Sequence, residues 1–244
     1  MIQDNAVIRP ARIKSLPDLG PVGIMVSSED DFQRIVKMMD VGDQKSRKLM
    51  LSRFYAGTGD YKGVCVVGPV VGAPYAVLLL EFLIAQGVKK IIYFGWCGSI
   101  HPEIEIGDIV LPVSSLIEEG TSVHYGEDFG QMVKASSELV DKLRTYLTVG
   151  GISFHEGPIW TTDAVYRETP EKVQFYQQQY ILAVEMELSA LFTVSRFRGI
   201  EAGGILVVSD GLGTLTWTPG FKNERFKASR RSISEMMADL CQVI

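Results

Sequence analysis

The feature that most constrains the fold is an alternation of short apolar runs with helical patterns along the whole chain. The apolar runs are rich in Val, Ile and Leu, which is typical of strands buried on both faces. They lie at residues 22–26, 64–67, 91–94, 109–111, 181–184 and 205–208. Helices are expected at residues 29–39, 74–86, 136–147, 170–178, 188–198 and 222–240. This alternation predicts an α/β fold with a mostly parallel or mixed sheet and helices on both faces.

The chain is expected to form one domain after an N-terminal arm. It has 244 residues, 46% of them apolar, and a chain of this length can bury about three quarters of its unfolded surface in one core. No repeat, low-complexity tract or flexible linker divides it. Pro10, Pro17 and Pro21 break any helix near the start. Residues 1–20 are therefore predicted to be an extended arm, and residues 21–244 the folded domain.

Composition and charge argue against several classes of function. The net charge is -5 and no run of basic residues could follow a phosphate backbone, so nucleic acid is not expected as a partner. The N-terminus lacks the apolar core of a signal peptide, and no stretch reaches the roughly 18 to 20 apolar residues of a membrane span. We therefore expect a cytoplasmic protein without a membrane partner. Cys65, Cys97 and Cys241 lack the spacing of a disulfide framework or a zinc site and are expected to be small buried residues.

Two glutamates follow the run at residues 181–184. In an open α/β sheet, ligands gather beyond the carboxyl ends of the strands, so polar residues at these ends are the first candidates for chemistry. Glu185 and Glu187 are two residues apart, which would place both carboxylates on one side of an extended chain, where they could grip a diol. Alternatively, both are acidic residues at the start of the next helix, where its dipole favours them.

Asp210 ends the apolar run at residues 205–208 and precedes a Gly-Leu-Gly loop. Desolvation favours the uncharged form of a carboxyl group, so an aspartate at the rim of a buried strand is a candidate general acid. The alternative is a Ser-Asp turn that binds its own backbone. Gly95 and Gly98 are expected around a strand terminus, where backbone N–H groups could approach an anion or a sugar, or where a tight turn needs glycine. His124 lies in a polar loop, as a surface residue or a substrate contact.

Four segments carry a resemblance to a known family: VEME, the downstream SD, GWCGSIHPEIEIGDIVLP and TTDAVYRETPE. With them, residues 23–240 resemble the nucleoside phosphorylase superfamily, which includes purine nucleoside phosphorylases, uridine phosphorylases and the methylthioadenosine/S-adenosylhomocysteine nucleosidases. The resemblance implies a single-domain fold with a central mixed, partly barrel-like sheet flanked by helices. It also implies a homo-oligomer, either a dimer or a hexamer built from dimers, with sites near the interface.

The resemblance assigns the ribose and the base to particular residues. Met186 and Glu187 would hold the ribose, Glu187 by its two secondary hydroxyls, with Glu185 beside them. Asp210, next to Ser209, would give or share a proton with N7 of a departing purine, and uridine phosphorylases lack this aspartate. The glutamine and arginine that read uracil would fall at Thr169 and Glu171, which cannot make those contacts, so a purine is favoured. The aromatic position that stacks on the base falls at Val165, with Tyr166 next to it.

The phosphate site departs from the phosphorylase pattern. Asp31 stands where the first loop has an arginine, Tyr93 replaces a second arginine and Trp96 replaces a hydroxyl residue. The resemblance implies that Tyr93 and Trp96, with Ser27, Cys97 and Gly98, would line the former phosphate pocket, and that Asp31 would occupy it. A carboxylate in place of an arginine repels an incoming phosphate. Nucleosidases of the superfamily have a carboxylate at the position of Asp31 that activates a water, so Asp31 is predicted to have this role.

The predicted function is cleavage of the N-glycosidic bond of a purine nucleoside, with water as the nucleophile. The substrate is the expected small-molecule partner, and no metal or organic cofactor is expected. One alternative is a phosphorylase of the purine or uridine type, with inorganic phosphate as co-substrate. Arg53 and His124 are then candidates to act across a subunit interface. The other alternative is a nucleoside-binding protein of the same fold without catalysis.

Overall fold

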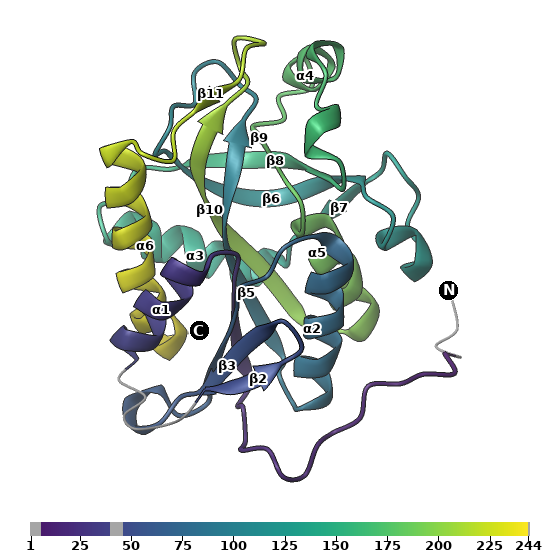
Figure 1. The fold of residues 1–244 in the computed structure, drawn as a ribbon, viewed down its shortest axis with the longest axis vertical. Helices are drawn as coiled ribbons and strands as arrows, with labels where there is room; N and C mark the ends of the chain where they lie inside the picture. Colours follow the sequence, from purple (N-terminus) through teal and green to yellow (C-terminus); the bar gives the residue numbers. More distant parts are fainter. Residues whose placement is uncertain (1–5, 40–45, 244) are drawn as a thin grey trace.

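The computed structural model describes residues 6–39 and 46–243 (Figure 1). The strands are β1 (Val22–Val26), β2 (Arg47–Leu49), β3 (Ser52–Ala56), β4 (Val64–Gly68), β5 (Lys90–Ser99), β6 (Ile109–Glu118), β7 (Met132–Lys134), β8 (His155–Thr162), β9 (Ala183–Glu185), β10 (Glu201–Gly211) and β11 (Thr218–Pro219). The α-helices are α1 (Glu29–Met38), α2 (Ala73–Ala85), α3 (Ser137–Val149), α4 (Pro170–Gln177), α5 (Leu188–Arg198) and α6 (Glu224–Val243). The predicted α/β class is confirmed.

Five strands of the sheet close into a barrel. β5 pairs in parallel with β10 and antiparallel with β9, β10 pairs antiparallel with β6, and β8 joins β6 to β9 through parallel pairings. β1, β4, β3 and β2 continue outward from β5 as an open part of the same sheet. The short strands β7 and β11 extend β6 and β10. This arrangement confirms the expected mixed, partly barrel-like sheet.

Each predicted apolar run contributes to a strand, but β5 differs from the prediction in a way that affects the site. β5 runs ten residues, through Ser99. Its pairing with β1 stops at Phe94, opposite Val26, and its second half is held by β10 and, at Gly98 and Ser99, by β9. Gly95 therefore lies inside the strand, contrary to the prediction, whereas Gly98 lies one residue before the strand terminus at Ser99, as predicted. The strand β8 was not predicted, because Gly157 and Pro158 interrupt its strand pattern.

The helices cover the sheet from two sides. α1 and α6 pack side by side on one flank, and α2 and α5 pack together on the other (Figure 1). In α6 the buried residues recur at helical spacing and include Phe226, Arg230, Ile233 and Met237. An arginine thus lies within the apolar stripe that faces the core.

The cysteine prediction is confirmed where it can be judged. Cys65 and Cys97 are buried and free, and burial raises the pKa of the Cys65 thiol to about 12. The side chain of Cys241 lies outside the described residues. Burial also raises the pKa of the Cys97 thiol well above its usual value, and neighbouring carboxylates add to this effect. Both thiols are therefore unreactive.

The N-terminal segment runs along the surface from residue 6 to residue 18 without helix or strand, and most of it is exposed (Figure 1). It is held near α2 by Gln86, whose side chain accepts from Ile13 N at 3.2 Å and donates to Ala11 O at 3.2 Å. The boundary between arm and domain remains a prediction. Among the described residues, no helix is long and apolar enough to cross a membrane.

Candidate active site

The candidate site lies at the carboxyl ends of the parallel strands β5 and β10, where the short strand β9 pairs with β5. β5 lies between β10 and β9, since Gly98 pairs with Asp210 on one side and with Val184 on the other. This register brings the SD and VEME segments to opposite sides of one glycine. A Cβ on Gly98 would lie 3.3 Å from Asp210 Oδ2 and 2.8 Å from the Leu212 side chain, so glycine leaves the room that the Asp210 carboxylate occupies.

Glu187 is buried at the start of α5 and is held from two sides. The Tyr93 hydroxyl donates to Glu187 Oε2 at 2.8 Å, and the backbone N–H of Gly72, just before α2, donates to Oε1 at 2.5 Å. Burial raises the pKa of Glu187, and these two donors act against that rise. Gly95 allows this contact, because a Cβ there would lie 2.4 Å from the Tyr93 ring.

Glu185 faces a different set of partners from Glu187. Its Oε2 accepts from Glu187 N at 2.7 Å and Leu188 N at 2.8 Å, and its Oε1 accepts from the Thr161 hydroxyl. It therefore satisfies the free N–H groups at the start of α5. Burial and the charge of Glu187 raise the pKa of Glu185 well above its usual value.

The extended chain on which the pairing of the two carboxylates was predicted ends at Glu185, although the two carboxylates lie close enough for the charge of Glu187 to raise the pKa of Glu185. β9 ends at Glu185, and Glu187 has φ -136° and ψ -39°, so strand alternation does not continue through this pair. Glu185 matches the alternative reading as an acidic residue at a helix start. Met186, between them, is half-buried, and its N–H donates to Glu187 Oε2 at 3.3 Å.

Asp210 lies on β10 with a donor on each oxygen. The Ser209 hydroxyl donates to Oδ1 at 2.5 Å, and the Trp217 indole N–H donates to Oδ2 at 2.9 Å. Ser209 also lies 3.2 Å from the carbonyl oxygen of Cys97, which links it to β5. Trp217 lies on the loop between β10 and β11, and its side chain is 58% exposed. Asp210 is thus fixed in place but remains near solvent.

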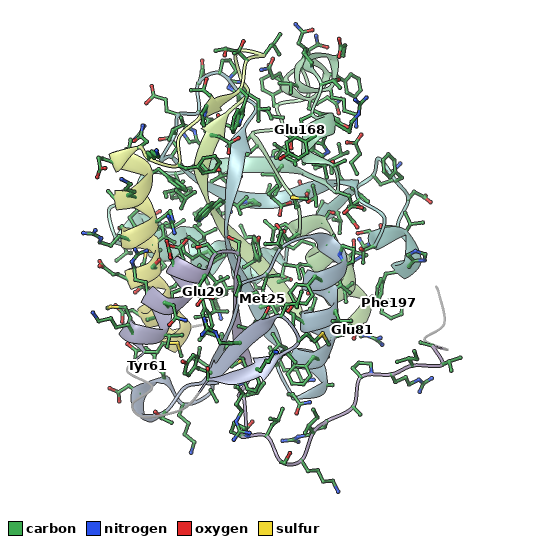
Figure 2. The ribbon with its side chains drawn as sticks, in the orientation of Figure 1. Met25, Glu29, Tyr61, Glu81, Glu168 and Phe197 are labelled. Atoms are coloured by element: carbon green, nitrogen blue, oxygen red, sulfur yellow. The ribbon has the colours of Figure 1, made fainter. Side chains whose placement is uncertain are left out.

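The expected base-binding segment forms the 3-10 helix η3 (Val165–Arg167), after β8. Val165 is 47% exposed and Tyr166 is 96% exposed, so the Tyr166 side chain extends into solvent while Val165 is about half covered. Glu168, the next residue along, lies between α4 and β8 (Figure 2). Burial and the negative charge of Asp210 raise the pKa of Glu168 to about 7. Glu168 is therefore a second titratable group beside Asp210, which the sequence analysis did not identify.

The first loop places Asp31 in the first turn of α1, where it is 1% exposed. Its carboxylate accepts from the Ser28 hydroxyl at 2.7 Å and from the Trp96 indole N–H at 2.9 Å. Arg34 contacts Oδ1 at 2.9 Å, and Arg230 from α6 contacts both oxygens at 3.1 and 3.0 Å. Four side chains thus donate hydrogen bonds to this one carboxylate at the same time, which leaves little room for a water molecule to bind. This geometry favours a structural role for Asp31 over the predicted activation of water.

The comparison with known proteins is decisive at the level of the family. The sequence profile described as "Phosphorylase superfamily" matches residues 21–243. This chain belongs to the phosphorylase superfamily.

Two curated relatives indicate the branch of the superfamily to which the chain is similar. A DeoD-type purine nucleoside phosphorylase of Caldanaerobacter subterraneus subsp. tengcongensis is 36% identical over 163 residues, which cover 66% of this chain and 70% of the relative. A guanosine phosphorylase of Halorubrum lacusprofundi is 28% identical over 198 residues, 80% of each protein.

Two solved structures share the fold of this superfamily member. Uridine phosphorylase from Vibrio fischeri superposes with a TM-score of 0.78 at 23% identity and covers 92% of both chains. Purine nucleoside phosphorylase from Toxoplasma gondii, in complex with immucillin-H, gives a TM-score of 0.79 at 21% identity, covering 93% of this chain and 92% of that one. At these identities the likeness concerns the fold alone.

The two residues predicted to act across a subunit interface lie at the surface of this superfamily member. Arg53 on β3 forms an ion pair with Glu29, and both line a cavity of about 360 Å³ with Lys48 and Ser52. His124 is exposed in the 3-10 helix η2 (Ser122–Tyr125). Within residues 6–39 and 46–243, no group of three or more His, Cys, Asp or Glu side chains is arranged to hold a metal ion.

Three contacts of the site were not predicted from the sequence: Arg230 with Asp31, Trp217 with Asp210, and Gly72 with Glu187. One of them had a recognisable signal: Arg230 interrupts the apolar stripe of α6, and a charged residue at a buried helix position needs a partner. The other two contacts come from loops, whose position depends on the assembled barrel.

Proposed function

We propose that this superfamily member cleaves the N-glycosidic bond of a purine nucleoside. The observation that carries the proposal is the register at Gly98, which brings the segments of Asp210 and Glu187 to opposite sides of β5. In this proposal Glu187 accepts from the two ribose hydroxyls, beside Met186. Asp210, on the other side of β5, gives a proton to N7 of the departing base or shares one with it. One carboxylate then holds the sugar while a second assists the leaving group, as bond cleavage through an oxocarbenium-like transition state requires.

A purine is the proposed base for two reasons. Asp210 is placed by Ser209 and Trp217 with its carboxyl group at the end of β10, where a purine N7 could share its proton. Two relatives of this chain are named as a purine nucleoside phosphorylase and a guanosine phosphorylase, and we extend that substrate class to this chain. Glu168, with a pKa near 7, adds a group that can accept from an amino or ring N–H of the base.

Water is the proposed nucleophile. The positions that bind phosphate in phosphorylases of this fold hold Asp31, Tyr93 and Trp96, whose polar groups all engage other protein groups. An incoming phosphate would meet a carboxylate and an indole there. An oxocarbenium-like transition state carries positive charge on the sugar, so a weak nucleophile such as water can capture it. The proposed reaction uses no metal and no organic cofactor.

Phosphorolysis is the second candidate. It is favoured by the names of the relatives and by the cavity that Lys48 and Arg53 line, which holds two cationic side chains. In this alternative, inorganic phosphate is the co-substrate and binds closer to β3 than the former phosphate pocket.

One assay separates these candidates. Purified protein is incubated with a panel of purine and pyrimidine nucleosides, with and without inorganic phosphate, and free base and sugar products are quantified by chromatography. The proposal predicts release of purine and free ribose, or its 5′-substituted form, at a rate independent of phosphate. Strict dependence on phosphate with ribose 1-phosphate as product would establish the second candidate. Binding of a nucleoside without turnover would indicate a non-catalytic binding protein.

We further propose that the protein forms a homo-oligomer built from dimers. Leu51, Val71 and Leu78 are 86%, 64% and 45% exposed. Leu51 and α2 are joined by Tyr75, whose hydroxyl lies 3.1 Å from Leu51 N. This apolar surface lies next to Arg53, so a dimer would bring Arg53 to an interface. Light scattering should give a mass of two or more chains, and Leu51→Glu should lower it. We also propose that the protein resides in the cytoplasm.

A further inference from the structure

The carboxylate of Asp31 is enclosed by a complete set of anion-binding donors. Two guanidinium groups, from Arg34 and Arg230, contact it at 2.9 to 3.1 Å, and the Ser28 hydroxyl and Trp96 indole N–H complete the set at 2.7 and 2.9 Å. Asp31 is 1% exposed and Arg230 is 8% exposed. Guanidinium, hydroxyl and indole donors that converge on one point are the groups that proteins use to bind carboxylate and phosphate oxygens.

Charge in this cluster is not balanced one to one. Two cationic side chains face a single buried carboxylate, because the neighbouring Asp30 points outward, is exposed and comes only within 4.0 Å of Arg230. If the Asp31 carboxylate were absent, the buried Arg230 and the Arg34 side chain, which is 32% exposed, would form a cationic pocket without an anion. Such a pocket favours any small oxyanion that can enter it.

The donors are also held in place independently of Asp31. The Arg230 guanidinium lies over the Trp96 ring at 4.3 Å and over the Phe226 ring at 5.2 Å. Trp96 and Phe226 pack edge to face, with ring centroids 5.2 Å apart. Stacking on two aromatic rings fixes the plane of the guanidinium, so loss of the carboxylate would leave the donors of Arg230 and Trp96 in position.

We propose that Asp31 is a built-in anion: its carboxylate fills an oxyanion site made by Ser28, Arg34, Trp96 and Arg230. The wild-type protein therefore binds no free oxyanion there, and removal of the side chain opens the site to inorganic phosphate or formate. This oxyanion site is supported by the set of contacts around Asp31 and does not depend on the proposed function. The proposed function is needed only for one consequence, namely that turnover does not require phosphate.

The test is thermal unfolding of wild type, Asp31→Ala and the matched control Asp30→Ala. Each is measured in phosphate, in formate and in a chloride buffer of the same ionic strength. Breaking a buried ion pair should lower the Tm of Asp31→Ala in chloride by roughly 6 to 20 °C. Phosphate or formate at about ten times its dissociation constant should raise that Tm by about 3 to 6 °C. Wild type and Asp30→Ala should show no rise specific to these anions.

The double variant Asp31→Ala/Arg230→Met removes the carboxylate and its main cationic partner together. It should fold and respond to neither phosphate nor formate. The proposal is overturned if Asp31→Ala gains no stability from either anion, whether or not it is folded at the start, or if wild type gains as much. The readout is anion binding, so absence of nucleoside cleavage would defeat the proposed function and leave this test unaffected.

Discussion

Removing the hydroxyl of Tyr93 should expose how this protein controls the charge of Glu187. Both side chains are buried, and the Tyr93 hydroxyl donates to Glu187 Oε2 at 2.8 Å. Tyr93→Phe keeps the ring, which packs over Gly95, and deletes only this donor. Burial and the two neighbouring glutamates raise the pKa of Tyr93 well above 10, so its hydroxyl is protonated throughout the range considered.

The size of the effect depends on pH. A hydrogen bond to a charged group contributes about 1.5–3 kcal/mol and one to a neutral group about 1 kcal/mol. The bond to the charged form is stronger by about 0.5–2 kcal/mol, so loss of the Tyr93 hydroxyl should raise the pKa of Glu187 further. Burial already raises the pKa of Glu187 in the folded protein above its value in the unfolded chain. The contribution of Glu187 to the free energy of unfolding is therefore fully present below the unfolded pKa and is lost as pH rises through the folded pKa. The variant should therefore lose more stability at alkaline pH than at acidic pH.

Urea unfolding of wild type and Tyr93→Phe at about pH 5 and about pH 9 measures this difference. We expect a loss of about 1 kcal/mol at the acidic end and about 1.5–3 kcal/mol at the alkaline end. A loss that is equal at both ends would refute the reasoning, because the hydroxyl would then not distinguish the ionised from the neutral glutamate.

Four further substitutions test the proposed site. Glu187→Gln should lower turnover by about 10²- to 10³-fold, measured by base release, and near-normal activity would exclude the ribose assignment. Asp210→Asn should slow a purine nucleoside by about 10²- to 10⁴-fold and a riboside with a good leaving group far less; equal slowing would make Asp210 a positioning residue. Trp217→Phe should reduce kcat by about 3- to 10-fold, and an unchanged kcat would show that its N–H is dispensable. Glu168→Gln should abolish an ionisation near pH 7 in the kcat/KM profile, and its persistence would assign that ionisation to another group.

The sequence by itself determined the fold class and the chemical character of the site. Apolar runs alternating with helical patterns required an α/β sheet, because strands buried on both faces leave no polar alternation. The short motifs around Glu187 and Asp210 identified the superfamily. The residues Asp31, Tyr93 and Trp96 predict, by the resemblance, where the phosphate site departs from the phosphorylase pattern. These features are local, so they could be recognised without any knowledge of how distant segments meet.

The tertiary structure decided which partner each of these side chains has. Glu185 caps α5 and Glu187 turns towards Tyr93, because the backbone leaves the strand conformation between them, and residue spacing alone cannot show this change. The partner of Asp31 is Arg230, 199 residues later in the chain, and it meets Asp31 only because α1 and α6 pack side by side. A contact over such a separation follows from barrel closure and helix packing. The role of a buried carboxylate therefore depended on the assembled fold.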